Sequence, residues 1–173
     1  MDIPPGEHYI HTGLILSADQ ARAIDAILAD LRDRARAALV LLTARDGQFI
    51  SASGENLRHM DLVSLGSLIA GDLAASHQVA QLAGVYEDYQ VVLREGRSSH
   101  ILVADAGAQM VLFMLVSSAV PVGWARLVGR EAARSLAEVV RPPAGGGEAS
   151  PQPAVGPDIS AEFDKALGDL WKS

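Results

Sequence analysis

Three strand-like segments in the second half of the chain are separated only by short turns. The segments cover residues 85–93, 98–104 and 109–116, and the turns are Glu95-Gly96-Arg97 and Asp105-Ala106-Gly107. Parallel strands need a crossover of a dozen or more residues, so strands joined by such turns pair antiparallel. We therefore predict a three-stranded antiparallel meander. The last strand is apolar throughout, which is typical of a strand covered on both faces.

The segments around the meander complete an α+β domain. Ser17 and Gln20 have the spacing of a capping box, and the Asp46-Gly47 pair is a hairpin turn signal. Apolar periodicity predicts helices at residues 17–35, 58–83 and 121–140, and strands at residues 38–43 and 48–53. The order α-β-β-α-β-β-β-α fits one five-stranded antiparallel sheet flanked by helices.

The composition changes after residue 140. Residues 141–157 contain five prolines and four glycines, a composition that cannot form a packed core and indicates a linker. Residues 1–16 show no clear period and are taken as an N-terminal extension. The predicted organisation is an extension (1–16), a domain (17–140), a linker (141–157) and a C-terminal segment (158–173).

The C-terminal segment is predicted to form a short amphipathic helix on a flexible tether. Its apolar stripe consists of Ile159, Phe163, Leu167, Leu170 and Trp171. A helix of about 15 residues is marginal alone in water, so its stripe needs a groove to dock into. Two alternatives follow: an arm that binds a partner, or a helix that folds back on its own domain.

The predicted helix at residues 58–83 has an unusual outer face. From Met60 to Ala83 the only charged side chains are Asp61 and Asp72, whereas a helix on a sheet normally shows charges to solvent. Helical spacing places large apolar side chains in one arc, namely Leu62, Leu65, Leu68, Ile69, Leu73 and Val79. Small neutral residues lie in the opposite arc: Gly66, Ser67, Ala70, Gly71, Ala74, Ala75 and Gln78. We interpret the small arc as a protein–protein interface, with burial inside the domain as the alternative.

Several function classes are disfavoured by composition. The net charge of −7 is unsuited to nucleic acid, and the absence of cysteine excludes thiolate zinc sites and thiol nucleophiles. No phosphate-binding glycine loop or nucleophile elbow occurs, and His8 and His11 lack a carboxylate cluster. We expect no catalytic residue, cofactor or metal. No membrane span or secretory leader is recognisable, so we expect a cytoplasmic protein that binds neither membrane nor nucleic acid.

The element order and three local motifs resemble the Roadblock family of the dynein light-chain type. The motifs are Leu39-Val40-Leu41-Leu42-Thr43-Ala44-Arg45-Asp46-Gly47, Leu68-Ile69-Ala70-Gly71-Asp72-Leu73-Ala74-Ala75-Ser76, and the stretch from Pro121-Val122-Gly123 to Gly129-Arg130-Glu131-Ala132-Ala133. The resemblance runs from about Ser17 to Val140. The linker and terminal helix are similar to the C-terminal arm of the bacterial MglB group.

The resemblance implies a homodimer joined through the second helix and third strand into one continuous sheet. The corresponding dimer residues are Ser67, Ala75, Tyr89, Val91 and Leu93. It also implies that a small Ras-like GTPase of the MglA type binds residues Gly66, Ala70, Gly71, Ala74 and Gln78. The arm is similar to one that binds the GTPase separately and tunes nucleotide exchange.

The implied activity is acceleration of GTP hydrolysis without an inserted catalytic residue, because the GTPase's own residues are held in alignment. Two alternatives remain at this point. A Roadblock scaffold subunit binds a GTPase without changing hydrolysis. A PAS- or profilin-like sensor domain has a similar mixture of sheet and helices but needs a lined ligand pocket, and aromatic residues are only 5% here.

Overall fold

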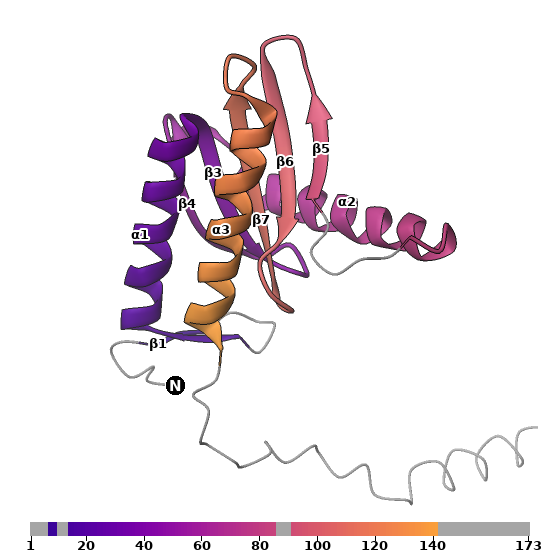
Figure 1. Ribbon diagram of the computed structural model, residues 1–173. Helices are drawn as coiled ribbons and strands as arrows, with labels where there is room; N and C mark the ends of the chain where they lie inside the picture. Colours follow the sequence, from indigo (N-terminus) through magenta and orange to yellow (C-terminus); the bar gives the residue numbers. More distant parts are fainter. Residues whose placement is uncertain (1–6, 10–13, 86–90, 142–173) are drawn as a thin grey trace, which may run out of the picture. The chain divides into compact units, whose positions relative to one another are not determined.

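Five strands form one antiparallel sheet in the computed structural model of the chain (Figure 1). Their order is β4-β3-β7-β6-β5, with bounds β3 Ala37–Ala44, β4 Phe49–Gly54, β5 Val91–Glu95, β6 Ser99–Asp105 and β7 Met110–Ser117. The meander β5-β6-β7 and the β3-β4 hairpin are both confirmed. The central strand β7 lies between β3 and β6, which explains its continuous apolar run.

The structure describes residues 7–9, 14–85 and 91–141. The chain divides into two units, residues 1–141 and 142–173. The predicted linker and C-terminal helix, with Ile159, Phe163, Leu167, Leu170 and Trp171, therefore lie outside the described residues, as does Tyr89.

Helices cover both faces of the sheet. The helices α1 (Ala18–Ala35) and α3 (Val122–Val140) lie side by side on one face, and α2 (Leu62–Leu82) crosses the opposite face (Figure 1). Successive β3 residues alternate between the two layers: Val40 and Leu42 pack under α1 and α3, whereas Leu39 and Leu41 pack under α2. This period-two alternation gives the domain two apolar cores, one on each face.

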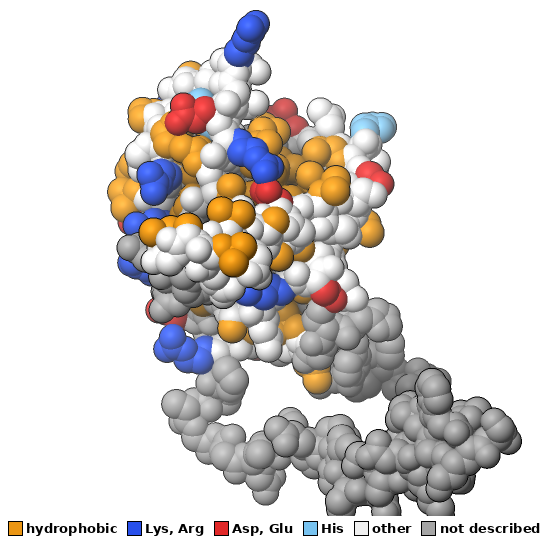
Figure 2. Space-filling model, turned by 90° about the vertical axis from the view of Figure 1, so that its right-hand side faces the viewer, with side chains coloured by type: hydrophobic (Ala, Val, Ile, Leu, Met, Phe, Trp, Pro, Cys, Tyr) orange, Lys and Arg blue, Asp and Glu red, His pale blue; other side chains and the backbone are white. Residues whose placement is uncertain are grey.

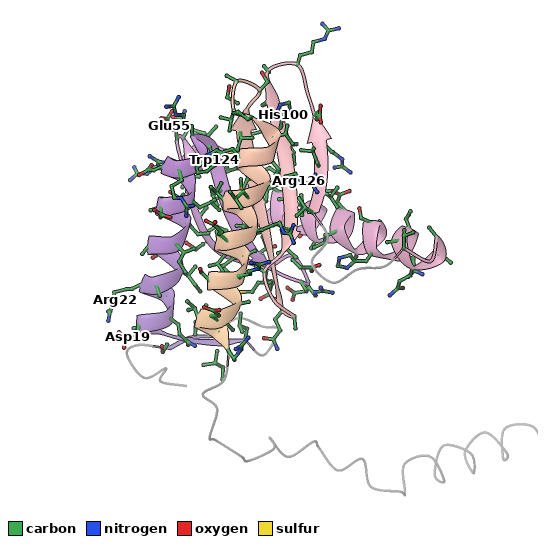
Figure 3. The ribbon with its side chains drawn as sticks, in the orientation of Figure 1. Asp19, Arg22, Glu55, His100, Trp124 and Arg126 are labelled. Carbon is green, nitrogen blue, oxygen red and sulfur yellow. The ribbon has the colours of Figure 1, made fainter. Side chains whose placement is uncertain are left out.

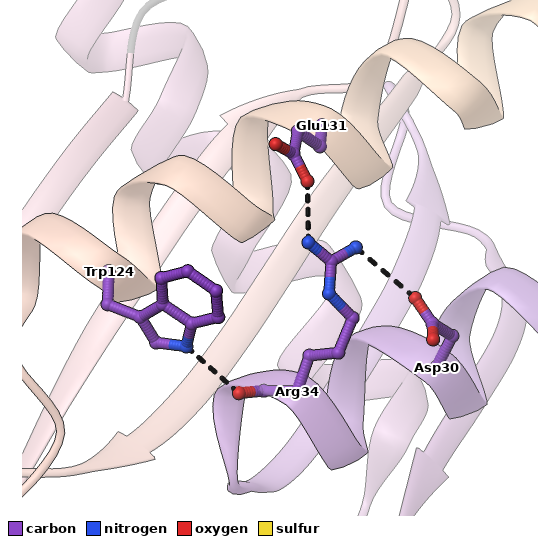
Figure 4. Close-up of polar contacts among 4 residues, drawn as sticks. All are labelled: Asp30, Arg34, Trp124 and Glu131. Atoms are coloured by element: carbon purple, nitrogen blue, oxygen red, sulfur yellow. Dashed lines mark hydrogen bonds and ion pairs between the residues drawn. The ribbon is translucent and has the colours of Figure 1, made fainter.

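Local signals explain where α1 begins and how it is tied to α3. Ser17 and Gln20 form the predicted capping box, each side chain bonded to the other residue's backbone N–H. At the far end, the Trp124 Nε1–H donates to the Arg34 carbonyl at 3.0 Å (Figure 4). The Arg34 guanidinium bonds Glu131 of α3 at 2.6 Å and Asp30 at 3.4 Å. These hydrogen bonds raise the pKa of Arg34, and the bond to Glu131 makes the largest contribution.

Two predicted boundaries were wrong. A 3₁₀ turn, η1 (Leu57–His59), precedes α2, which starts only after Asp61 because that carboxylate accepts the Ser64 backbone N–H as an N-cap. The segment before residue 17 is not merely an extension. It contains the short strands β1 (Glu7–Tyr9) and β2 (Ile15–Ser17), and Leu14 and Leu16 are buried in the core beneath α1 and α3.

Candidate protein–protein interface

The face of α2 that packs on the sheet contains both large and small residues. Ile69 and Leu73 pack on Leu41 and Phe113 of the sheet. Gly66 and Ala70 lie on the same inner face and are also buried. Small residues here let the helix backbone approach the sheet closely, because a larger side chain would hold it away.

The closest approach is between Gly66 and the turn at Gly47. A Cβ atom on Gly66 would lie 2.6 Å from the Gly47 carbonyl oxygen and 3.0 Å from the Thr43 Cγ2. Gly47 itself has φ +88°, and a Cβ there would lie 2.5 Å from the Ser67 Cα. The β3-β4 turn and the start of α2 are therefore in direct backbone contact.

Polar contacts hold the rest of α2 in place. The half-buried Asp72 pairs with Arg94 of β5, and the Ser76 hydroxyl donates to the Asp72 carbonyl at 2.9 Å. Further along, the His77 Nε2 lies 2.8 Å from an oxygen of the buried Asp105. The other Asp105 oxygen accepts from Arg45 at 2.5 Å. These contacts explain why polar side chains occur on the inner side of a largely apolar helix.

The outer face of α2 is uncharged and partly apolar. Large side chains are exposed along it: Val63 (66%), Leu68 (72%), Val79 (66%) and Leu82 (81%). Between them lie the small or neutral exposed residues Ser64, Ser67, Gly71, Ala74, Ala75 and Gln78. None of these exposed residues carries a charge. An exposed apolar face of this kind marks an interaction surface in soluble proteins.

The edge strand β5 is joined to α2 by the Arg94–Asp72 ion pair. It pairs with β6, and within the described residues no strand pairs with its other edge. An unpaired edge presents backbone N–H and C=O groups to which another strand can bond. Figure 2 shows the side of the domain that carries β5 and the end of α2, where hydrophobic side chains reach the surface in several places.

The structure separates the predicted site residues into two groups. Ser67, Gly71, Ala74, Ala75 and Gln78 are exposed on the outer face of α2. Val91 and Leu93 are half-buried in the edge strand, packed against the core beneath α1 and α3. The roles of all these residues in partner binding or dimerisation stay predictions.

The placement of two predicted contact residues on the outer face was wrong. Gly66 and Ala70 are buried against the sheet, since the helix needs small residues at its closest approach. Conversely, Leu68 and Val79, which helical spacing assigned to the inner arc, are exposed. The prediction from sequence therefore missed the largest side chains of the outer face. A hydropathy pattern assigns leucine rather than glycine to the buried face of a helix, and here the reverse holds.

Comparisons with known proteins agree with this architecture. No protein-family model and no curated protein matches the sequence. Among solved structures, MglB of Myxococcus xanthus is similar at 30% identity, covering 67% of this chain and 93% of that one, with a TM-score of 0.62. The chain belongs to the Roadblock family and is close to MglB.

Two further structures share the fold of this Roadblock protein. One is described as MglB with a tetrameric arrangement, at 22% identity, 80% and 97% coverage and a TM-score of 0.64. The other is a Roadblock/LC7 domain from Streptomyces avermitilis, at 22% identity, 66% and 92% coverage and a TM-score of 0.56. The predicted α+β Roadblock fold is thereby confirmed, and the family relationship favours a regulatory domain over an enzyme.

The described residues add two observations on chemistry. They contain no group of three or more His, Asp or Glu side chains arranged to hold a metal ion. None of the described helices is long and apolar enough to cross a membrane.

Proposed function

We propose that this Roadblock protein is a homodimeric regulator of an MglA-type small Ras-like GTPase that accelerates GTP hydrolysis. The observation that carries the proposal is the outer face of α2, where exposed apolar side chains flank small neutral residues with no exposed charge. The likeness to MglB supports the choice of partner. In the proposed complex, Gly71, Ala74 and Gln78 contact the GTPase.

The proposed mechanism needs no catalytic residue from this chain. A surface that binds the hydrolysis-competent conformation of a GTPase more tightly than its other conformations shifts the population toward that state. The GTPase's own groups then act in a preorganised site. A tenfold acceleration corresponds to about 1.4 kcal/mol of differential binding. Small, rigid side chains suit this role, because few rotamers are lost on binding.

The dimer is proposed to form through β5 and the adjoining face of α2. Pairing of two β5 edges would satisfy their free backbone groups and join two five-stranded sheets. Ser67 and Ala75 of α2 lie on the exposed side that such a dimer would bury. A solved MglB with a tetrameric arrangement supports self-association in this family.

A sensor function has less support. A ligand pocket typically measures about 300–1,000 Å³. The larger hollow on α3, about 470 Å³, is open and lined mainly by charged side chains rather than apolar ones. The apolar hollow between α3 and the sheet, lined by Leu102, Leu112 and Met114 among others, measures about 10 Å³. That volume accommodates about one water molecule.

The test is single-turnover GTP hydrolysis by a small Ras-like GTPase of the MglA type, with and without the full chain. An increase of roughly tenfold or more supports an activator. An unchanged rate with a stable complex on a sizing column identifies a scaffold instead. An unchanged rate without a complex contradicts the GTPase proposal altogether.

A matched pair of variants then tests the surface. Ala74→Arg places a long cation on the exposed outer face of α2, whereas Ala29→Arg makes the same change at an exposed position of α1. Both positions are open to solvent, so both variants should fold. We expect Ala74→Arg to lose the complex and Ala29→Arg to retain it. Loss of binding in both variants, or in neither, would refute the assignment of this face.

A further inference from the structure

Three arginines form a ridge along the exposed side of α3. Arg126, Arg130 and Arg134 recur at every fourth residue, and all three are exposed. At a rise of 1.5 Å per residue the ridge is about 12 Å long. Leu127, half-exposed at 50%, lies beside it. Arg126 points to the side of α3 that faces β6 and β5, whereas Trp124 lies toward α1 (Figure 3).

The arginine ridge has no carboxylate partner among the described residues. Arg22, Arg32, Arg34, Arg45 and Arg94 each form an ion pair with an acidic side chain. No ion pair or side-chain hydrogen bond joins the ridge arginines to the part of the chain that the structure describes. Of the two acids on α3, Glu131 is already bonded to Arg34 at 2.6 Å, and Glu138 forms no ion pair with the ridge.

Arg36, Arg58, Arg97 and Arg141 also form no ion pair among the described residues, but only the ridge places three such arginines on one face of a helix. Two further observations bear on this clustering. The chain has 21 acidic residues against 14 basic ones, so carboxylates are in excess. Like charges four residues apart also destabilise a helix. An anionic partner would remove that repulsion, and the ridge is therefore better explained as a binding surface than as a stabilising feature.

The surface beside the ridge is hollowed. An open hollow of about 470 Å³ is lined by the ridge arginines together with Leu127 and Glu131. It lies on α3, which covers the face of the sheet opposite to α2. The hollow is thus separate from the candidate interface on α2.

We propose that the arginine ridge docks an acidic helical segment of a partner protein. Carboxylates spaced four residues apart on such a segment match the spacing of the three guanidinium groups, and arginine bonds carboxylates in a bidentate manner. An apolar residue on the segment can rest on Leu127. A membrane surface fits less well, because the ridge is one helix wide and the net charge of −7 is repelled by anionic lipid.

The experiment measures binding of a fluorescein-labelled, alanine-rich helical peptide to the full chain. The probe carries glutamates at three positions spaced four residues apart and one leucine, and the control peptide carries glutamines instead. We expect the glutamate peptide to bind, and 0.5 M salt to weaken it, because exposed charge pairs are screened. The variant Arg126→Gln/Arg130→Gln/Arg134→Gln should bind roughly tenfold more weakly or worse. Arg97→Gln, at another exposed arginine, should bind as the parent does.

Four outcomes would overturn the proposal. Equal binding of the glutamine peptide, or undiminished binding by the triple variant, would show that the ridge does not recognise carboxylates. Binding of phosphatidylserine vesicles without binding of the peptide would assign the ridge to lipid. A change in the sedimentation mass of the triple variant alone would assign it to an interface between copies. The proposal fails separately from the proposed function, because the peptide assay contains no GTPase.

Discussion

Two glycines of α2 provide a sharp test of how the helix sits on the sheet. Gly66 faces the sheet, and a Cβ atom there would lie 2.6 Å from the Gly47 carbonyl oxygen. Gly71 is five residues further on the exposed face, and a Cβ there would meet nothing within 4 Å. Replacing each by alanine is the same chemical change in the same helix, but in opposite environments.

The two variants should differ because only one of them clashes. Alanine in place of glycine favours a helix by about 0.5–1 kcal/mol at either position. At Gly66 the added methyl meets a backbone atom that cannot move independently, and such overpacking destabilises by roughly 1–3 kcal/mol. The propensity gain is common to both variants, so the difference in their unfolding free energies isolates the clash. We expect Gly66→Ala to be less stable than Gly71→Ala by about 1–3 kcal/mol.

Urea denaturation followed by circular dichroism gives both free energies. The curves are recorded at two protomer concentrations, so that self-association is separated from folding. The difference corresponds to roughly 4 °C in melting temperature per kcal/mol for a domain of this size. Equal stability of the two variants, or a less stable Gly71→Ala at both concentrations, would refute the packing of α2 described above.

Three further predictions concern polar groups. Asp105→Asn removes the carboxylate between Arg45 and His77 and should lower the unfolding free energy in urea by about 1–3 kcal/mol. Ser17→Ala breaks the capping box of α1 and should cost about 1 kcal/mol in the same assay. Hydrogen bonds from Ser64 lower the pKa of Asp61 below its ordinary 3.8, so its stabilising effect is present above that value and is lost as the pH falls through the lower folded pKa. Parallel denaturation series should therefore show the parent losing more stability than Asp61→Asn between pH 5 and pH 2, and identical acid profiles would contradict this reasoning.

The order of elements was predictable from local patterns. Period-two and period-3.6 spacing of apolar residues, the capping box at Ser17 and the Asp46-Gly47 turn each act within a few residues. Turn length then dictated antiparallel pairing for the meander. The burial of β7 on both faces could also be predicted, because its own segment is apolar throughout.

The orientation of α2 depended on the tertiary structure. Its sequence is apolar nearly all round, so periodicity alone does not distinguish the face that meets the sheet from the face that meets a partner. The close approach to the Gly47 turn requires a small residue at Gly66, and that requirement comes from a segment distant in sequence. Likewise, Asp72 and His77 lie inward because Arg94 and Asp105 are there to pair with them. Local hydropathy determines which segments become helices and strands, whereas the exposure of Leu68 and Val79 is decided by which face fits the sheet most closely.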